Sequence, residues 1–154
     1  MKIMKIIPRM ILAVLFLTSQ PAFAETLYKV KFTNLSDKKI HIHRDYYECM
    51  NDAGEIDITV LQHGSKELDL KDSDNFFRCA NSQRYVNWVV NYPYGGDIIS
   101  CKLTFSVYLR GKWYMQVNGC NELVKKATCG DIDCHNKSAS YYEMKDKNIN
   151  ITLD

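Results

Sequence analysis

Residues 99–118 read ISCKLTFSVYLRGKWYMQVN, the clearest β-hairpin pattern in the chain. On both sides of Gly111, apolar and polar residues alternate with a period of two, which is typical of strands that bury one face. We expect a three-residue loop at 109–111, with Gly111 in the left-handed conformation that glycine adopts most readily. This loop would place Val107 opposite Trp113, so that apolar residues of the two strands meet on the same face.

The hairpin register also bears on Cys101 and Cys120, which lie near its two ends. These cysteines would face each other only with a two-residue turn. That turn would also set Phe105 opposite Gln116, because a slip of one residue moves a strand to its other face. The preferred register therefore argues against a simple cross-strand Cys101–Cys120 bond unless a β-bulge intervenes.

The same alternation recurs along the chain and indicates about eight or nine short strands separated by turn residues. Further strands are expected near residues 28–33, 40–43, 56–60, 68–70, 86–92 and 149–153. A helical turn or two is expected at 121–128. Many short strands with polar turns predict an all-β, mainly antiparallel fold. We expect a small disulfide-stapled β-sandwich, with a small β-barrel as the alternative.

The first 24 residues have the pattern of a secretory signal peptide. Lys2, Lys5 and Arg9 form a positive region, an apolar run follows at 10–17, and small residues flank a cut in Ala22-Phe23-Ala24. We therefore expect cleavage after Ala24, one domain at 25–154, and a secreted or periplasmic protein. The apolar run is shorter than the ~20 residues that span a bilayer, and no second run follows, so stable membrane insertion is not expected.

The charge of the exported chain differs from that of the full sequence. The full chain has a net charge of +2, and the three residues Lys2, Lys5 and Arg9 are the only charged ones before Glu25. Without them the net charge is −1. A nearly neutral protein has no strong field to attract phosphate backbones, so a nucleic-acid partner is not expected.

All six cysteines follow residue 24, and an oxidising compartment favours disulfides over metal thiolates. Cys129 and Cys134 are separated by four residues that include Gly130, so we predict that they close a small loop. The other two bonds involve the remaining four cysteines in a pairing that the sequence leaves open. These are Cys49, Cys79, Cys101 and Cys120.

His41, His43 and Asp45 form the sharpest local pattern for chemistry. On a strand these alternate positions share one face, and two imidazoles with a carboxylate could hold zinc or copper. The alternative is the polar outer face of a half-buried strand, since Ile40 and Ile42 alternate with the histidines.

Four tyrosines are candidate contact residues. Tyrosine offers a large, amphipathic surface that anchors protein interfaces and stacks on sugar rings. Tyr108 and Tyr114 are expected on the outer face of the hairpin, Tyr85 on an outer strand face, and Tyr94 in a loop. The alternative is ordinary surface decoration, because single exposed aromatic residues are common.

The motifs of common enzyme classes are absent from the sequence. There is no G-x-S-x-G, S-x-x-K or H-E-x-x-H pattern, and no P-loop or dinucleotide fingerprint. We therefore expect a protein that binds a protein or carbohydrate ligand, for example an enzyme inhibitor or a secreted effector, without catalysis and without a cofactor. Two alternatives are a zinc- or copper-dependent protein and a membrane-active toxin.

Overall fold

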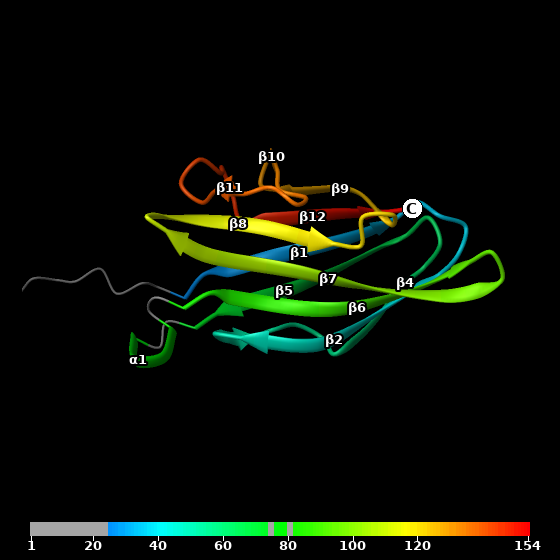
Figure 1. Cartoon of the computed structure of the whole chain (residues 1–154), viewed down its shortest axis with the longest axis horizontal. Helices are drawn as coiled ribbons and strands as arrows, with labels where there is room; N and C mark the ends of the chain where they lie inside the picture. Colours follow the sequence, from blue (N-terminus) through cyan, green and yellow to red (C-terminus); the bar gives the residue numbers. More distant parts are fainter. Residues whose placement is uncertain (1–24, 74–75, 80–81) are drawn as a thin grey trace, which may run out of the picture.

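The computed structural model describes residues 25–73, 76–79 and 82–154 of the 154-residue chain. The expected signal peptide, residues 1–24, lies outside the described residues. Twelve strands are described, together with a single turn of helix, α1 (Phe76–Cys79). The strands run along the long axis of the molecule and form two six-stranded sheets that pack face to face (Figure 1).

The first sheet contains both ends of the described chain. Its strand order is β10 (Ile132–Asp133), β9 (Val124–Cys129), β12 (Asn148–Leu153), β1 (Leu27–Asn34), β5 (Ser65–Asp72) and β3 (Met50–Asp52). The pairing of β1 with β12 is parallel, and the other pairings in this sheet are antiparallel. The first and last strands are thus neighbours at the centre of the sheet.

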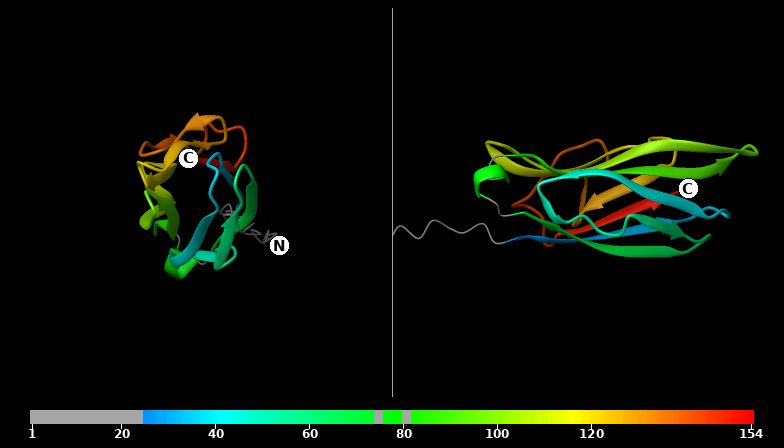
Figure 2. Two further views of the ribbon diagram at one scale, coloured as in Figure 1. Left: turned by 90° about the vertical axis from the view of Figure 1, so that its right-hand side faces the viewer. Right: turned by 90° about the horizontal axis from the view of Figure 1, so that it is seen from below.

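The second sheet contains the long hairpin. Its order is β11 (Ala139–Ser140), β8 (Lys112–Gly119), β7 (Asp97–Arg110), β6 (Arg84–Tyr94), β2 (Ile40–Glu48) and β4 (Asp57–Val60). All these ladders are antiparallel. The end-on view in Figure 2 shows the two layers. No ladder between described strands closes them into a barrel, so the sandwich prediction is confirmed and the barrel alternative is wrong.

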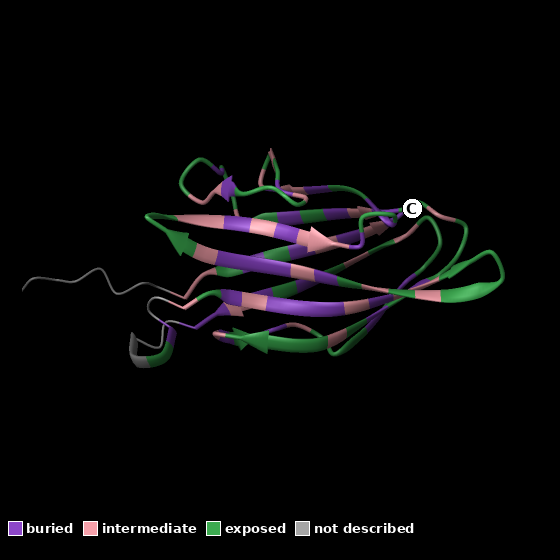
Figure 3. Ribbon diagram, viewed as in Figure 1, coloured by how far each residue is buried: buried purple, intermediate pink, exposed green. Residues whose placement is uncertain are grey.

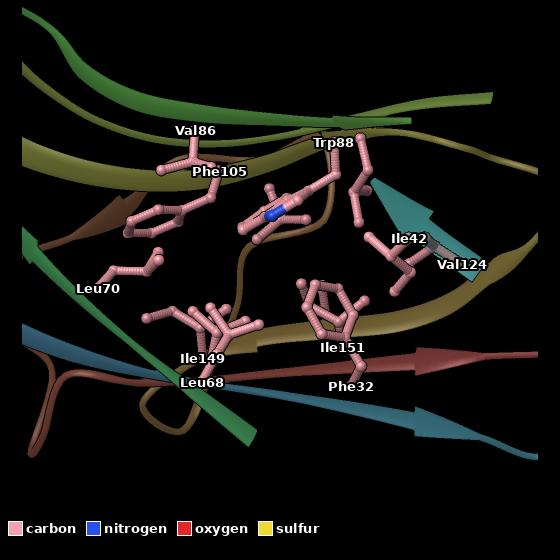
Figure 4. Packing of buried hydrophobic residues seen from close by; sticks show 14 of the residues in the cluster. Phe32, Ile42, Leu68, Leu70, Val86, Trp88, Phe105, Val124, Ile149 and Ile151 are labelled. Atoms are coloured by element: carbon pink, nitrogen blue, oxygen red, sulfur yellow. The ribbon is translucent and has the colours of Figure 1, made fainter. Parts of the chain in front are cut away.

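The core lies between the inner faces of the two sheets. Buried and more exposed residues alternate along β1, β5 and β12. Figure 3 colours the described residues by their burial. Trp88 of β6 is 1% exposed, and its ring meets that of Phe32 edge-on at a centroid distance of 5.4 Å. Figure 4 shows these two rings among the aliphatic side chains of both sheets, where burial of apolar area supplies most of the stabilisation.

The hairpin register differs from the prediction by two residues. Val107 lies opposite Met115, and Trp113 lies opposite Leu109 instead of Val107. Gly111, with a φ of 72°, is the single residue between the paired strand ends. An offset of two keeps every side chain on its expected face, so the assignment of inner and outer faces holds. Trp113 moves to the margin of the core, where the Arg84 guanidinium lies 4.7 Å from the centre of one of its rings.

The disulfides join Cys49 to Cys79, Cys101 to Cys120, and Cys129 to Cys134. The last pair is the one that its short spacing suggests. The Cys101–Cys120 bond is one that the expected register disfavoured. It forms because the ladder ends at Gly119, where Gly119 and Cys120 both have positive φ angles, 95° and 48°, and turn the chain back toward β7.

Residues 121–128 are not helical as expected. A turn over Cys120–Leu123 is followed directly by β9, which pairs with β12 from Val124 onward. Ladder hydrogen bonds and the burial of Val124 and Ala127 outweigh the weak helical preference of this segment.

Candidate functional site

Tyr108 and Tyr114 form a pair on the outer face of the second sheet. They are direct partners in the β7–β8 ladder, and their rings stack at a centroid distance of 5.8 Å with an angle of 28° between the planes. Their neighbours Val107 and Met115 are buried on the opposite face. The Tyr108 hydroxyl is hydrogen-bonded to the Ser138 hydroxyl. Both tyrosines therefore lie where the sequence places them, half-exposed and held in position.

Tyr85 forms a second pair on the same face, with Tyr46 of β2. Their ring centroids are 5.8 Å apart. Burial, followed by the nearby Glu48 side chain, raises the pKa of Tyr85. Sequence reasoning missed Tyr46, because a β-bulge between Arg44 and Tyr46 shifts the register of β2 against β6. Bulges have no clear sequence signal here, so the outward position of Tyr46 was visible only in the structure.

Uncharged polar side chains lie between the two tyrosine pairs. In one row across the sheet, Ser106 of β7 lies between Tyr85 of β6 and Gln116 of β8. Ser106 is only 1% exposed, although its side chain is on the outer face. In the next row Thr104 donates a hydrogen bond of 2.6 Å to Asn87. We call this surface the tyrosine face; it comprises Tyr46, Tyr85, Tyr108 and Tyr114 with Asn87, Thr104, Ser106, Gln116 and Asn118.

The candidate metal ligands do not form one group. His43 Nδ1 lies 2.7 Å from Asp57 of β4, and His41 Nδ1 lies 3.0 Å from the Thr59 hydroxyl. Asp45 falls in the bulge of β2, with its carboxylate 3.8 Å from Lys102. Among residues 25–73, 76–79 and 82–154, no three His, Cys, Asp or Glu side chains are grouped so that they could hold a metal ion. A bulge at Asp45 interrupts the period of two on which the common face of the three residues was predicted.

Tyr94 lies apart from the tyrosine face, at one end of the sandwich. It is 69% exposed and lines a groove of about 660 Å³ together with Tyr92 and Pro93 of the same strand. We call this cavity the end groove; its other lining residues are Ser36, Asp37, Lys38, Ile40, Asn121, Glu122, Leu123, Lys125 and Asp154. Its volume is within the range of about 300–1,000 Å³ that is usual for small-molecule sites.

A buried ion pair closes the opposite end of the sandwich. Arg84 Nε lies 3.3 Å from Asp72 Oδ2, without the alignment of a hydrogen bond, and the Tyr28 hydroxyl donates to the same oxygen at 2.9 Å. Burial, with Asp72 close by, raises the pKa of Tyr28 far above its usual range. The pair joins β5 of the first sheet to β6 of the second, so its role is structural.

The described residues contain no helix that is long and apolar enough to cross a membrane. The three disulfides are typical of proteins in an oxidising, extracytoplasmic compartment. No protein family matches this chain, and no curated protein is significantly similar to it.

Proposed function

We propose that this chain is an exported binding protein that captures a protein partner on the tyrosine face and catalyses no reaction. The observation that carries this proposal is the arrangement of two tyrosine pairs, Tyr108–Tyr114 and Tyr46–Tyr85, on one outer sheet face. Tyrosine is among the residues that most often dominate binding energy at protein interfaces.

The distribution of charge supports a protein partner. The centre of the tyrosine face is uncharged, since Asn87, Thr104, Ser106 and Gln116 lie between the aromatic pairs. Charged groups such as the Lys102–Asp45 pair lie at its margin. An interface core that is poor in charge and rich in aromatic residues, with a charged rim, is the usual anatomy of protein–protein contacts.

The face is also preorganised, which limits the entropy lost on binding. Each tyrosine is held by its neighbour, and Tyr108 is held further by Ser138. The face stands on regular ladders of β6, β7 and β8, which move less than loops do. A partner would therefore meet side chains that are already ordered, and fewer side chains would need to be immobilised.

The test is capture of a partner from the exported proteins of the native host, followed by measurement of binding with the purified partner. Replacing both Tyr108 and Tyr114 by Ser should abolish capture and weaken binding by about thirtyfold or more for each binding hot spot lost. The control is Tyr142→Ser, since Tyr142 is 68% exposed in the loop after β11 and lies outside the face.

A second variant separates binding from folding. Gln116→Lys adds a charge to the uncharged centre of the face without removing a ring, and it should also weaken binding. The proposal is refuted if the Tyr108/Tyr114 variant and Gln116→Lys both capture the partner as well as the wild type does, each with an unchanged unfolding curve.

A further inference from the structure

The end groove exists because the second sheet is longer than the first. The hairpin of β6 and β7 extends past the ends of the other strands, as Figure 1 shows at the right. Along the inner face of β6, Val90 is fully buried, Tyr92 is half-buried and Tyr94 is 69% exposed. Residues two apart on a strand share a face. Both tyrosines therefore line the same wall, where the facing sheet has ended.

The remaining walls are held rigidly against this hairpin. The Cys101–Cys120 bond, with a Cα–Cα distance of 5.2 Å, ties β7 to the turn that carries Asn121, Glu122 and Leu123. The backbone N–H of Asp154 donates to the Leu123 carbonyl at 2.9 Å. A cavity whose walls are joined by a covalent bond keeps its shape without a ligand, so a ligand would pay little for ordering it.

The third wall is the turn at residues 36–38, and a buried side chain orders it. Asn34, with 0% exposure, donates to the Lys38 carbonyl at 2.6 Å. Its oxygen accepts hydrogen bonds from the Ser36 backbone N–H at 3.0 Å and the Ser36 hydroxyl at 2.8 Å. All three walls of the groove are thus fixed by disulfide or hydrogen-bond contacts.

Both acidic and basic side chains line the groove. Asp37, Glu122 and Asp154 face Lys38 and Lys125 around the same cavity. Within the described part of the chain, none of these five side chains takes part in an ion pair. Asn121 uses its oxygen to accept a bond from Asn136, which leaves its N–H₂ group for a ligand.

This combination fits a neutral ligand that has many hydroxyl groups. Three carboxylates and two lysines give these side chains a net charge of only −1, and a charged ligand of either sign would also meet groups of its own sign. A sugar offers donors to the carboxylates, acceptors to the lysines and Asn121, and an apolar ring face to the tyrosines. We propose that the end groove is a carbohydrate-binding site for a neutral oligosaccharide, with Tyr94 as the main stacking residue.

This site is separate from the tyrosine face and does not depend on the proposed protein partner. Neutral hexasaccharides of three linkage types, cellohexaose, chitohexaose and maltohexaose, are suitable probes for isothermal titration calorimetry with the intact, disulfide-bonded protein. At least one probe should bind saturably at up to millimolar concentration. Tyr94→Ala should weaken that binding by about tenfold or more. Tyr142→Ala, at a residue of nearly equal exposure, is the matched control and should leave it unchanged.

The outcomes distinguish the two proposals. The Tyr108/Tyr114 variant should keep saccharide binding, and Tyr94→Ala should keep capture of the protein partner. The groove proposal is overturned if none of the three hexasaccharides binds, or if Tyr94→Ala binds as tightly as the wild type. Since Tyr94 is exposed, this substitution does not threaten the core. Lys125→Ala gives a second, independent readout at the opposite wall and should also weaken binding.

Discussion

Asn34 is the residue whose substitution tests the structure most directly. It is fully buried at the end of β1, and its Nδ2 group faces three backbone carbonyls, those of Lys38 at 2.6 Å, Leu61 at 3.1 Å and Val60 at 3.2 Å. Its Oδ1 accepts two further bonds from Ser36. One side chain therefore satisfies backbone groups in two separate turns, 35–39 and 60–64.

We expect Asn34→Ala to lower the free energy of unfolding by about 3–5 kcal/mol. The two Nδ2 hydrogens and the two bonds to Oδ1 amount to four hydrogen bonds, each with a net value of ~1 kcal/mol, and the carbonyls left unpaired in the interior add to the loss. This would be a large part of the 5–15 kcal/mol that is usual for a domain.

Asn34→Asp sharpens the test, because it changes almost no volume. An ionised carboxylate would face three carbonyl oxygens with no hydrogen to donate, so the loss at neutral pH should be at least as large as for alanine. The site favours the protonated acid, which raises the pKa of this new group in the folded state. Part of the lost stability should therefore return as the pH falls toward ~4, the ordinary pKa of aspartate.

Urea unfolding of the disulfide-bonded protein, followed by tryptophan fluorescence, measures both variants. The control is Asn150→Asp, on the exposed side of β12, which should change stability by no more than about 0.5 kcal/mol. A loss below ~1 kcal/mol at neutral pH for Asn34→Asp would refute the assignment of Asn34 as a buried hydrogen-bonding centre.

Three other predictions follow from particular contacts. Gly119→Ala should lower the melting temperature sharply, because φ is 95° and the new Cβ would collide with the Lys102 carbonyl. The control is Gly95→Ala, which has a φ of 60° and open space around it and should lower the free energy of unfolding by only ~1 kcal/mol. Asp72→Asn should cost ~3–5 kcal/mol by leaving the buried Arg84 unpaired, and adding Arg84→Met should recover part of that loss in a double-mutant cycle. The Lys137 ammonium donates a hydrogen bond to Asp133 and lowers the pKa of that carboxyl. NMR titration of Asp133 should therefore give a midpoint below the ordinary value for aspartate, and Lys137→Met should raise that midpoint. This exposed pair favours folding above the ordinary pKa of aspartate and loses its small effect as the pH falls through the lowered one.

Much of the sandwich could be predicted because its evidence is local. Alternation with a period of two marks which side chains of β1, β7 and β12 face the core, and it does so whatever the partner strand is. For this reason the inner and outer faces of the β7–β8 hairpin were right although its register was not. The outward position of Tyr108 and Tyr114 follows from the same rule.

The features that could not be predicted depend on contacts between distant parts of the chain. In the observed register Trp113 lies near the hairpin turn, where it contacts Arg84 of β6. The Cys101–Cys120 bond depends on a turn in which Cys120 takes a positive φ. The bulge between Arg44 and Tyr46 belongs to the pairing of β2 with β6, and Tyr46 lies beside Tyr85 in that arrangement.

The division follows from the range of the forces involved. The period of side chains, the turn residues and the spacing of Cys129 and Cys134 are properties of a few adjacent residues, so the amino-acid order alone was enough to predict strands, faces and a local disulfide loop. The end groove is different, since it joins residues 36–38, 40, 92–94, 121–123, 125 and 154. It arises only because two sheets of unequal length stack, and that stacking is a property of the whole core, where many weak apolar contacts act together.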